Sequence, residues 1–341
     1  MPYGAERVMI VTMEAQVSMP LAHEKWFVDD PGAYPSDWSF FFEAPTLLFA
    51  GAAVGIALLW RWAAVRFLPV PELRILTPLA RLVPWIPRIL GIHLGVSLLS
   101  LAVDDAYLAP QLVVPDGVGG VLLVFAEGII GIWLISGIYL RPAAVGVVLL
   151  GPLGLVLAGP IEVLEACDLL GLALFLVILP PGRNAWGRVD VGPDVEIAAL
   201  YCLRVLLGAA LIVLAFSEKL ANPELASQFL DDYPAFNLFE VIGIDLADET
   251  FIRLAGAVEL LFGLMLISGA APQLTVLIAG IPFNTTLFFL GRVELIGHLP
   301  IYGAMLALLV YGSSPRHAPM VRELWPFGRL RREALTPQDG R

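Results

Sequence analysis

Charged residues are scarce in this chain. Only 15% of its 341 residues are Asp, Glu, Lys or Arg, 58% are hydrophobic, and the mean hydropathy is +0.82. Soluble domains carry roughly 25% charged residues. The composition therefore excludes an ordinary soluble protein, and it predicts an all-α protein that crosses a lipid bilayer several times.

Cysteine and lysine are almost missing as well. The two cysteines, Cys167 and Cys202, are expected near opposite membrane faces, which excludes a disulfide framework. Only two lysines, Lys25 and Lys219, accompany 18 arginines, and no basic face of the kind that binds nucleic acid is present. Motifs for nucleotides, zinc or a catalytic nucleophile are also missing, so no metal site is predicted.

Nine apolar stretches are long enough to cross roughly 30 Å of hydrocarbon. The predicted spans lie near 45–66, 86–104, 117–140, 142–159, 161–180, 196–216, 250–270, 272–290 and 294–312. Cytoplasmic loops of membrane proteins are enriched in Lys and Arg. Because 15 of the 18 arginines fall on one side, we expect a multi-pass protein of the plasma membrane, with its N-terminus outside and its C-terminus in the cytoplasm.

The predicted membrane domain contains an internal repeat. Pairs of identical residues recur 132 positions apart, namely Glu127 and Glu259, Gly131 and Gly263, Gly159 and Gly291, Glu162 and Glu294, and Gly171 and Gly303. The first helices of the two copies match at a spacing of 113, as in Gly95 and Gly208. Copy two therefore carries 19 extra residues, roughly Glu224 to Asp248, which we expect to form short amphipathic helices at the outer surface.

These patterns divide the chain into six parts. They are an external N-terminal segment (1–44), a transmembrane helix with its inner connection (45–83), repeat 1 (84–181), an inner linker (182–195), repeat 2 (196–312) and a cytoplasmic Arg-rich tail (313–341). Aromatic residues of the first segment, such as Trp26, are expected to anchor it among lipid headgroups. Four spans in each repeat predict parallel repeats related by an axis along the membrane normal.

Three short stretches of copy two carry a resemblance to a known family. They are Arg204-Val-Leu-Leu-Gly208, Ser217-Glu-Lys219-Leu and Glu259-Leu-Leu-Phe-Gly263-Leu-Met-Leu. This pattern resembles the DoxX/DoxD-like family of four-helix membrane proteins, with Arg and Gly in the first helix, a G-x-x-K-L helix end and E-x-x-x-G-x-x-L in the second helix. Phe216 replaces the Gly that often precedes the Lys, and copy one has Asp104-Asp105-Ala106 in place of Ser217-Glu218-Lys219.

The resemblance implies two tandem four-helix bundles, the first of them degenerate, after one N-terminal helix. The family includes a membrane subunit of thiosulfate:quinone oxidoreductase, and related members are associated with thiol and redox-stress systems. The resemblance therefore implies a bound quinone or a redox partner, with no covalently attached cofactor.

Glu127 and Glu259 are the strongest candidates for proton handling. Each lies about ten residues into its predicted span, where an ionisable group is costly and is usually functional or internally paired. A buried carboxyl suits proton exchange. The alternative is a protonated Glu that hydrogen-bonds neighbouring helices as a structural group.

Glu162 and Glu294 are candidates for ligand binding at the outer mouth. Both follow a Gly at a predicted helix start, so each is also explained as an acid in the first turn that interacts with exposed N–H groups. His298 lies four residues after Glu294 and shares its helix face. The pair is therefore also a candidate proton relay.

Three basic residues complete the candidate ligand-binding set. Lys219 ends the first span of copy two and is expected to pair with Glu218, Glu294 or the extra residues, or to extend to the membrane interface. Arg88 and Arg204 enter their helices from the inner side. They either extend to the interface or bind an anionic head group or a quinone carbonyl.

Three functions remain open from the sequence. The first is a quinone-facing or redox-partner membrane subunit without a redox centre of its own, working with an external or peripheral redox protein. Parallel repeats with carboxylates near the midplane equally suit a small-solute or proton-coupled carrier. The third is a non-catalytic scaffold for an exported redox enzyme. Beyond the lipid bilayer no partner is identified, and a homo-oligomer is compatible with the sequence.

Overall fold

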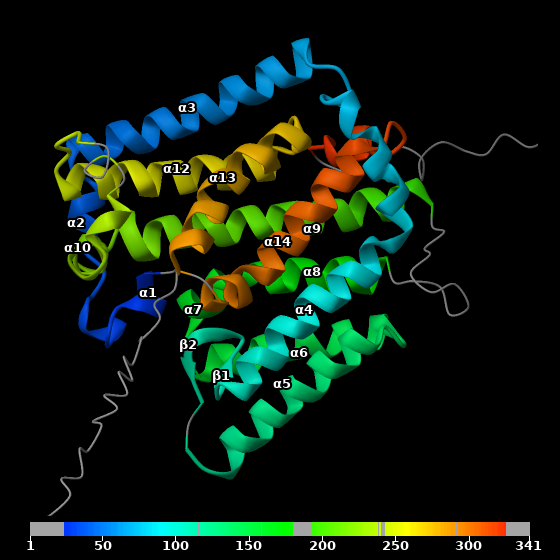
Figure 1. Ribbon diagram of the computed structural model, residues 1–341, viewed down its shortest axis with the longest axis horizontal. Helices are drawn as coiled ribbons and strands as arrows, with labels where there is room; N and C mark the ends of the chain where they lie inside the picture. Colours follow the sequence, from blue (N-terminus) through cyan, green and yellow to red (C-terminus); the bar gives the residue numbers. More distant parts are fainter. Residues whose placement is uncertain are drawn as a thin grey trace, which may run out of the picture.

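A computed structural model describes residues 24–324 apart from 115, 158, 180–191, 238, 240–242 and 291. Residues 1–23, most of the predicted inner linker and the end of the Arg-rich tail lie outside the described residues. The described part is almost entirely helical (Figure 1). An all-α architecture is thus confirmed apart from one short antiparallel hairpin, in which Ala106 pairs with Val113 and Tyr107 with Ala109.

The elements follow one another as helices joined by short connections. The N-terminal part contains α1 (Glu24–Phe27), α2 (Trp38–Phe41) and α3 (Ala44–Phe67), followed by a 3-10 segment, Arg74–Trp85. Copy one contains α4 (Ile86–Val103), β1 (Ala106–Tyr107), β2 (Ala109–Val113), α5 (Val118–Ser136), α6 (Leu140–Leu157), α7 (Pro160–Glu165) and α8 (Cys167–Ile178). Copy two contains α9 (Pro193–Leu214), α10 (Pro223–Asp232), α12 (Asp248–Ser268), α13 (Pro272–Leu290) and α14 (Arg292–Ser313), and α15 (Ala318–Val321) follows.

Seven helices of the described residues are long and apolar enough to cross a membrane, which indicates a multi-pass membrane protein. The predicted count of nine is not confirmed within the described residues. The predicted span 161–180 is interrupted at Ala166, which separates α7 from the short apolar α8. The predicted span 272–290 is helical as α13, which is not among the seven.

The first two long helices of each copy cross at equivalent glycines. A Cβ added to Gly95 of α4 would lie 2.6 Å from the carbonyl oxygen of Gly131 in α5. The corresponding Cβ on Gly208 of α9 would lie 2.5 Å from the carbonyl oxygen of Gly263 in α12. Such backbone contact between helices requires small residues at the crossing. The repeated glycines therefore occupy equivalent contacts in both copies.

The interface between the copies is reciprocal. A Cβ on Gly171 of α8 would lie 3.1 Å from Cβ of Leu206 in α9, and one on Gly303 of α14 would lie 3.0 Å from Cβ of His93 in α4. Gly171 and Gly303 are equivalent positions of the repeat, and so are His93 and Leu206. Contacts that recur in both directions are typical of two-fold related units. His93 is consequently a packing residue at the junction.

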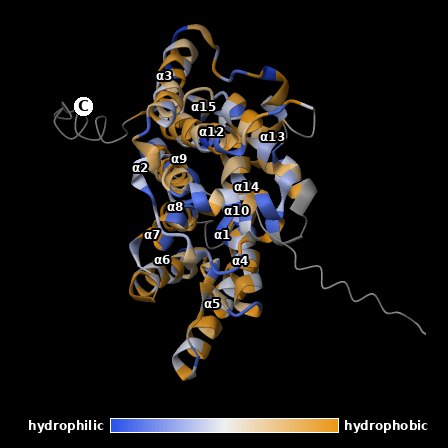
Figure 2. Ribbon diagram, turned by 90° about the vertical axis from the view of Figure 1, so that its left-hand side faces the viewer, coloured by the Kyte–Doolittle hydropathy of each residue, from blue (hydrophilic) through white to orange (hydrophobic). Residues whose placement is uncertain are grey.

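Apolar side chains cover the outer surfaces of the peripheral helices. Leu48 and Leu58 of α3 are 74% and 68% exposed, and Val121 of α5 is 66% exposed. Figure 2 shows hydrophobic residues over α3, α5 and α6. Exposed apolar helix faces of this extent match contact with lipid.

The extra residues of copy two begin with a short amphipathic helix, α10, as predicted. In α10 the side chains of Leu225, Ala226, Phe229 and Leu230 are buried, and they pack with Ile252 of α12 and Val28 beside α1. Figure 1 shows α10 and α1 at the same end of the helix bundle. This end of copy two is therefore covered by α10 and the N-terminal segment.

Candidate functional site

The candidate site is centred on Lys219. The chain changes from α9 into a π-helical turn, Ala215–Leu220, and such turns are frequent at functional sites because they re-aim side chains. Lys219 is 7% exposed, and its Nζ lies 3.3 Å from Oε1 of Glu259 and 3.7 Å from Oε2 of Glu218. Gly256 lies against the base of this lysine side chain, with room only for hydrogen at its Cα. The sequence prediction that Lys219 pairs with Glu218 is thus met.

Glu24 supplies a third carboxylate from the N-terminal segment. Its Oε1 lies 3.3 Å from Nζ of Lys219, and its backbone N–H donates to Oε2 of Glu218 at 3.3 Å. Glu24 is 5% exposed. Burial raises the pKa of Glu24 to about 8, against the opposing charge of Lys219. The segment around Trp26, expected to anchor among headgroups, is instead inserted into the protein.

Lys25, the next residue, binds copy one. Its Nζ lies 2.6 Å from Oε1 of Glu165 and 3.2 Å from Oε2 of Glu162. Burial lowers the pKa of Lys25, but the charges of Glu165, Glu162 and Glu218 and the hydrogen bond to Glu165 together outweigh burial, so the pKa is raised overall. Glu162 therefore serves as a partner of Lys25, and it also lies in the first turn of α7, as predicted.

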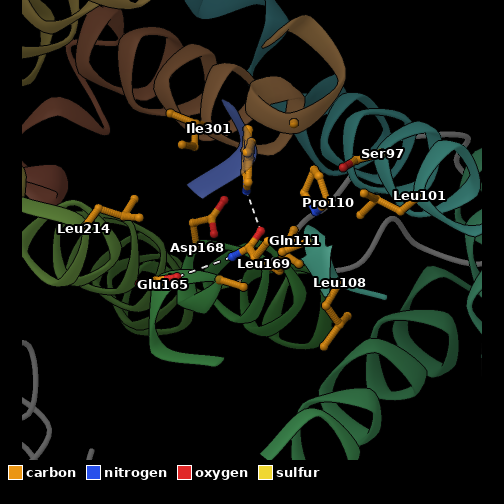
Figure 3. Close-up of a pocket in the computed structure, with 14 residues that line it drawn as sticks. Ser97, Leu101, Leu108, Pro110, Gln111, Glu165, Asp168, Leu169, Leu214 and Ile301 are labelled. Atoms are coloured by element: carbon orange, nitrogen blue, oxygen red, sulfur yellow. Dashed lines mark hydrogen bonds between the residues drawn. The ribbon is translucent and has the colours of Figure 1, made fainter. Parts of the chain in front are cut away.

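Trp26 lies at the seam between the copies. Its indole N–H donates to Oε1 of Gln111, and its ring centroid lies 5.5 Å from that of His298. Gln111 in turn donates to Oε2 of Glu165 at 3.3 Å, a bond that Figure 3 shows beside Asp168. The small cavity drawn there has a volume of about 30 Å³, which suits water and not a larger ligand. The four residues of α1 thus link both copies.

Substituting Gly297 tests this arrangement. A Cβ at this position would overlap the ring of Trp26, so we expect Gly297→Ala to displace α1 at a steric cost of about 1–3 kcal/mol. Lys25 and Lys219 are the chain's two lysines, so endoproteinase Lys-C reports on this site alone. Cleavage after Lys25 should become about tenfold faster, since each 1.4 kcal/mol is a factor of ten.

Gly55→Ala in α3 is the matched control, because nothing lies within 4 Å of its added Cβ. An unchanged cleavage rate in Gly297→Ala would show that Trp26 does not hold α1 in place.

Glu294 and His298 form a buried pair on α14. Nδ1 of His298 lies 2.8 Å from Oε1 of Glu294, and Oγ1 of Thr286 donates to the same oxygen at 2.5 Å. Glu294 is fully buried and His298 is 2% exposed. The expected contact at four-residue spacing is therefore present. Glu294 also lies in the first turn of α14, as predicted.

A cavity of about 330 Å³ adjoins these residues in copy two. Its polar end is formed by Glu24, Lys219, Glu259, Thr286 and His298. Its walls carry five phenylalanines, Phe229, Phe236, Phe251, Phe262 and Phe283. The lining residue Ile281 is 66% exposed, so the cavity reaches the protein surface along α13. Apolar cavities of roughly 300–1,000 Å³ with a few convergent polar groups are typical ligand sites.

Copy one lacks this arrangement around the equivalent carboxylate. Glu127 is fully buried, and its Oε1 accepts a hydrogen bond from the backbone N–H of Leu108 at 3.0 Å. The adjacent Tyr107 donates to the carbonyl oxygen of Leu150 at 2.7 Å. The β1–β2 hairpin thus binds Glu127 through its backbone, whereas the equivalent Glu259 of copy two contacts the charged Lys219. The two repeated carboxylates have different surroundings.

Arg88, near the start of α4, and Arg204, in the middle of α9, contact the ends of neighbouring helices, apart from the cavity. Arg88 donates to the carbonyl oxygen of Leu134 at 3.2 Å, and Arg204 donates to that of Ile267. These carbonyls belong to the last turns of α5 and α12, which carry the negative end of the helix dipole. Both arginines are therefore helix-capping residues in this structure, and they do not line the cavity.

Comparisons with known proteins do not identify the chain. No family model, no curated protein and no solved structure matches it. The resemblance to the DoxX/DoxD-like family consequently remains a prediction. Among the described residues, no group of three or more His, Cys, Asp or Glu side chains could hold a metal ion.

Proposed function

We propose that this protein is a quinone-facing or redox-partner membrane subunit, and that its ligand site is the phenylalanine-lined cavity of copy two. The observation that carries the proposal is the junction of this cavity with Lys219, Glu259 and His298. An apolar ring fits walls of phenylalanine, and a carbonyl oxygen fits a polar end that offers N–H and O–H donors. A bound quinone would supply the redox chemistry.

The residues of this chain would position the ligand and exchange protons with it. Lys219 is a donor for an acceptor oxygen, and Glu259 is half-buried with its side chain 31% exposed. His298 and Glu294 form the second proton-exchanging pair at the same end. Glu127 is assigned a structural role, because its carboxylate accepts a bond from the hairpin backbone.

Small molecules that co-purify with the detergent-extracted protein test the proposal. Mass spectrometry should find a quinone at near-stoichiometric amounts in the wild type. Glu259→Gln should retain about tenfold less, since a hydrogen bond to a charged group contributes about 1.5–3 kcal/mol. Glu127→Gln, the equivalent change in copy one, should retain the wild-type amount. A preparation without quinone, or equal loss in both variants, would contradict the proposal.

A proton-coupled carrier is the second candidate. It is favoured by the three carboxylates around Lys219, because carboxylates in excess of the lysine can bind either protons or a solute. The arginine distribution supports an N-terminus outside and a C-terminus in the cytoplasm of the plasma membrane. In that orientation α1 and α10 cover the outer mouth of copy two. The same covered mouth would be the docking face of an external redox protein.

A further inference from the structure

The polar end of the cavity carries more negative than positive side chains. Glu24 and Glu259 line the cavity, and Glu218 lies directly behind them against Lys219. Lys219 is the one lysine or arginine among the lining residues. Lys25 is paired with Glu162 and Glu165 of copy one instead. Three carboxylates therefore surround one ammonium group, and two negative charges are uncompensated when all are ionised.

Two carboxylate oxygens at this end have unused hydrogen-bonding capacity. Within the described residues, Oε2 of Glu24 and Oε2 of Glu259 are buried without a hydrogen-bond partner. Glu24 is more than nine-tenths buried and lines the cavity. A buried carboxylate oxygen without a partner is costly unless it binds a proton or another cation. The cavity thus offers a position for positive charge.

The walls favour the same kind of ligand. Five phenylalanine rings line the space between this polar end and the surface at Ile281. The faces of aromatic rings attract organic cations by about 0.5–2 kcal/mol each. An anion would gain little here, because Lys219 already has three carboxylate partners. The aromatic walls and the excess of carboxylates together favour cationic ligands over anionic ones.

We propose that the cavity takes a monovalent organic cation with an apolar body, whose charge replaces one proton held by Glu24 or Glu259. The inference rests on the proposed function only in placing the ligand in this cavity. For the carrier function, the inference specifies the ligand class: the cavity binds an organic cation and releases a proton. No covalent step is involved.

Proton release predicts the pH dependence. The charged or titratable groups that face Glu24 and Glu259 are Glu218, Lys219 and His298, with Glu294 beyond the histidine. Because burial raises the pKa of Glu24 to about 8, protons compete with the cation below that pH. The affinity should therefore rise with pH, by up to about tenfold per unit when one proton is released.

Benzyltrimethylammonium is a suitable probe, because neopentylbenzene has the same shape without the charge. Titration calorimetry of the full chain in detergent should give at least tenfold tighter binding of the cation than of neopentylbenzene. No binding of the anion 3-phenylpropionate is expected. Glu259→Gln should weaken the cation about tenfold, whereas Glu127→Gln should not. Ala255→Phe, which fills the cavity without changing its charge, should abolish binding.

The outcomes separate this inference from the quinone proposal. Equal affinities for the cation and neopentylbenzene, or an unchanged cation affinity in Glu259→Gln, would overturn the inference. Decylubiquinone binding would then still support the quinone site. Cation binding with the expected pH dependence, in the absence of decylubiquinone binding, would support the inference and contradict the quinone proposal. If neither probe binds, both are wrong.

Discussion

Lys219→Met should destabilise the protein by about 3–5 kcal/mol at neutral pH, because it removes one partner from a buried charge group. Lys219 Nζ lies within 4 Å of carboxylate oxygens from Glu24, Glu218 and Glu259. Without the ammonium group, these oxygens repel one another at the polar end of the cavity. The loss should appear as a thermal midpoint several degrees lower, measured by size-exclusion chromatography after heating. Arg81→Met, at an exposed position, is the control and should leave the midpoint unchanged.

The same measurement at several pH values identifies the origin of the loss. Acid protonates the carboxylates and relieves their repulsion, so the difference between Lys219→Met and the wild type should narrow as the pH falls. In the wild type, burial raises the pKa of Glu24 from its usual 4.5 to about 8. The folded state then holds more protons than the unfolded state between these values, so stability falls as the pH rises through this window. Glu24→Gln should flatten that slope. If the decrease in thermal midpoint in Lys219→Met does not depend on pH, the lysine contributes to stability only through packing.

The sequence predicted the parts of the site that follow from local spacing. His298 and Glu294 contact each other because residues four apart share a helix face. Glu259 and Gly263 were identified by their recurrence, and Lys219 by its place at a helix end. Periodicity and repetition carry this information directly, so no knowledge of tertiary packing was required.

The sequence did not identify the contribution of the N-terminal segment. Glu24 and Lys25 come from a four-residue helix preceded by residues outside the description, and they meet partners 194 and 140 residues away. No local sequence pattern encodes such pairing, because the pairing depends on how helices that are distant in the sequence pack at this end of the bundle. The aromatic character of Trp26 suggested the membrane interface, yet the same indole has a polar partner in Gln111. The available signal in the sequence was the adjacent charged pair Glu24 and Lys25, in a chain where charged residues are scarce.

The repeat also concealed a difference between the copies. Glu127 and Glu259 are identical in the sequence pattern, and copy one was predicted to be only a degenerate version of copy two. The distinction arises in the connection after the first helix, where copy one forms the β1–β2 hairpin and copy two has the π-helical turn with Lys219. A hairpin with strands of two and five residues has no reliable sequence signal. The functional assignment of the carboxylates therefore depends on the connections and not on the repeated helices.

The helix crossings allow stability and ligand binding to be separated. Gly263→Ala should cost about 3 kcal/mol, since its Cβ would lie 2.6 Å from the carbonyl oxygen of Gly208, and a backbone atom cannot move aside as a side chain does. Gly131→Ala in copy one should cost a similar amount, with a Cβ 2.8 Å from the carbonyl oxygen of Gly95. Gly119→Ala meets nothing within 4 Å and should stabilise its helix by about 0.5–1 kcal/mol. Thermal unfolding of the three variants gives the comparison.

Ligand binding by the folded fraction then distinguishes the copies. Gly263 lies on α12, one turn beyond Glu259 and next to the lining residue Phe262, so forcing α12 away from α9 should move the walls of the cavity. Gly131→Ala changes the equivalent crossing in copy one, where the hairpin holds the carboxylate. Loss of binding in Gly263→Ala, with retention in Gly131→Ala at equal stability, would assign the ligand site to copy two. Equal loss in both variants would contradict that assignment, because a general decrease in stability would then explain the effect.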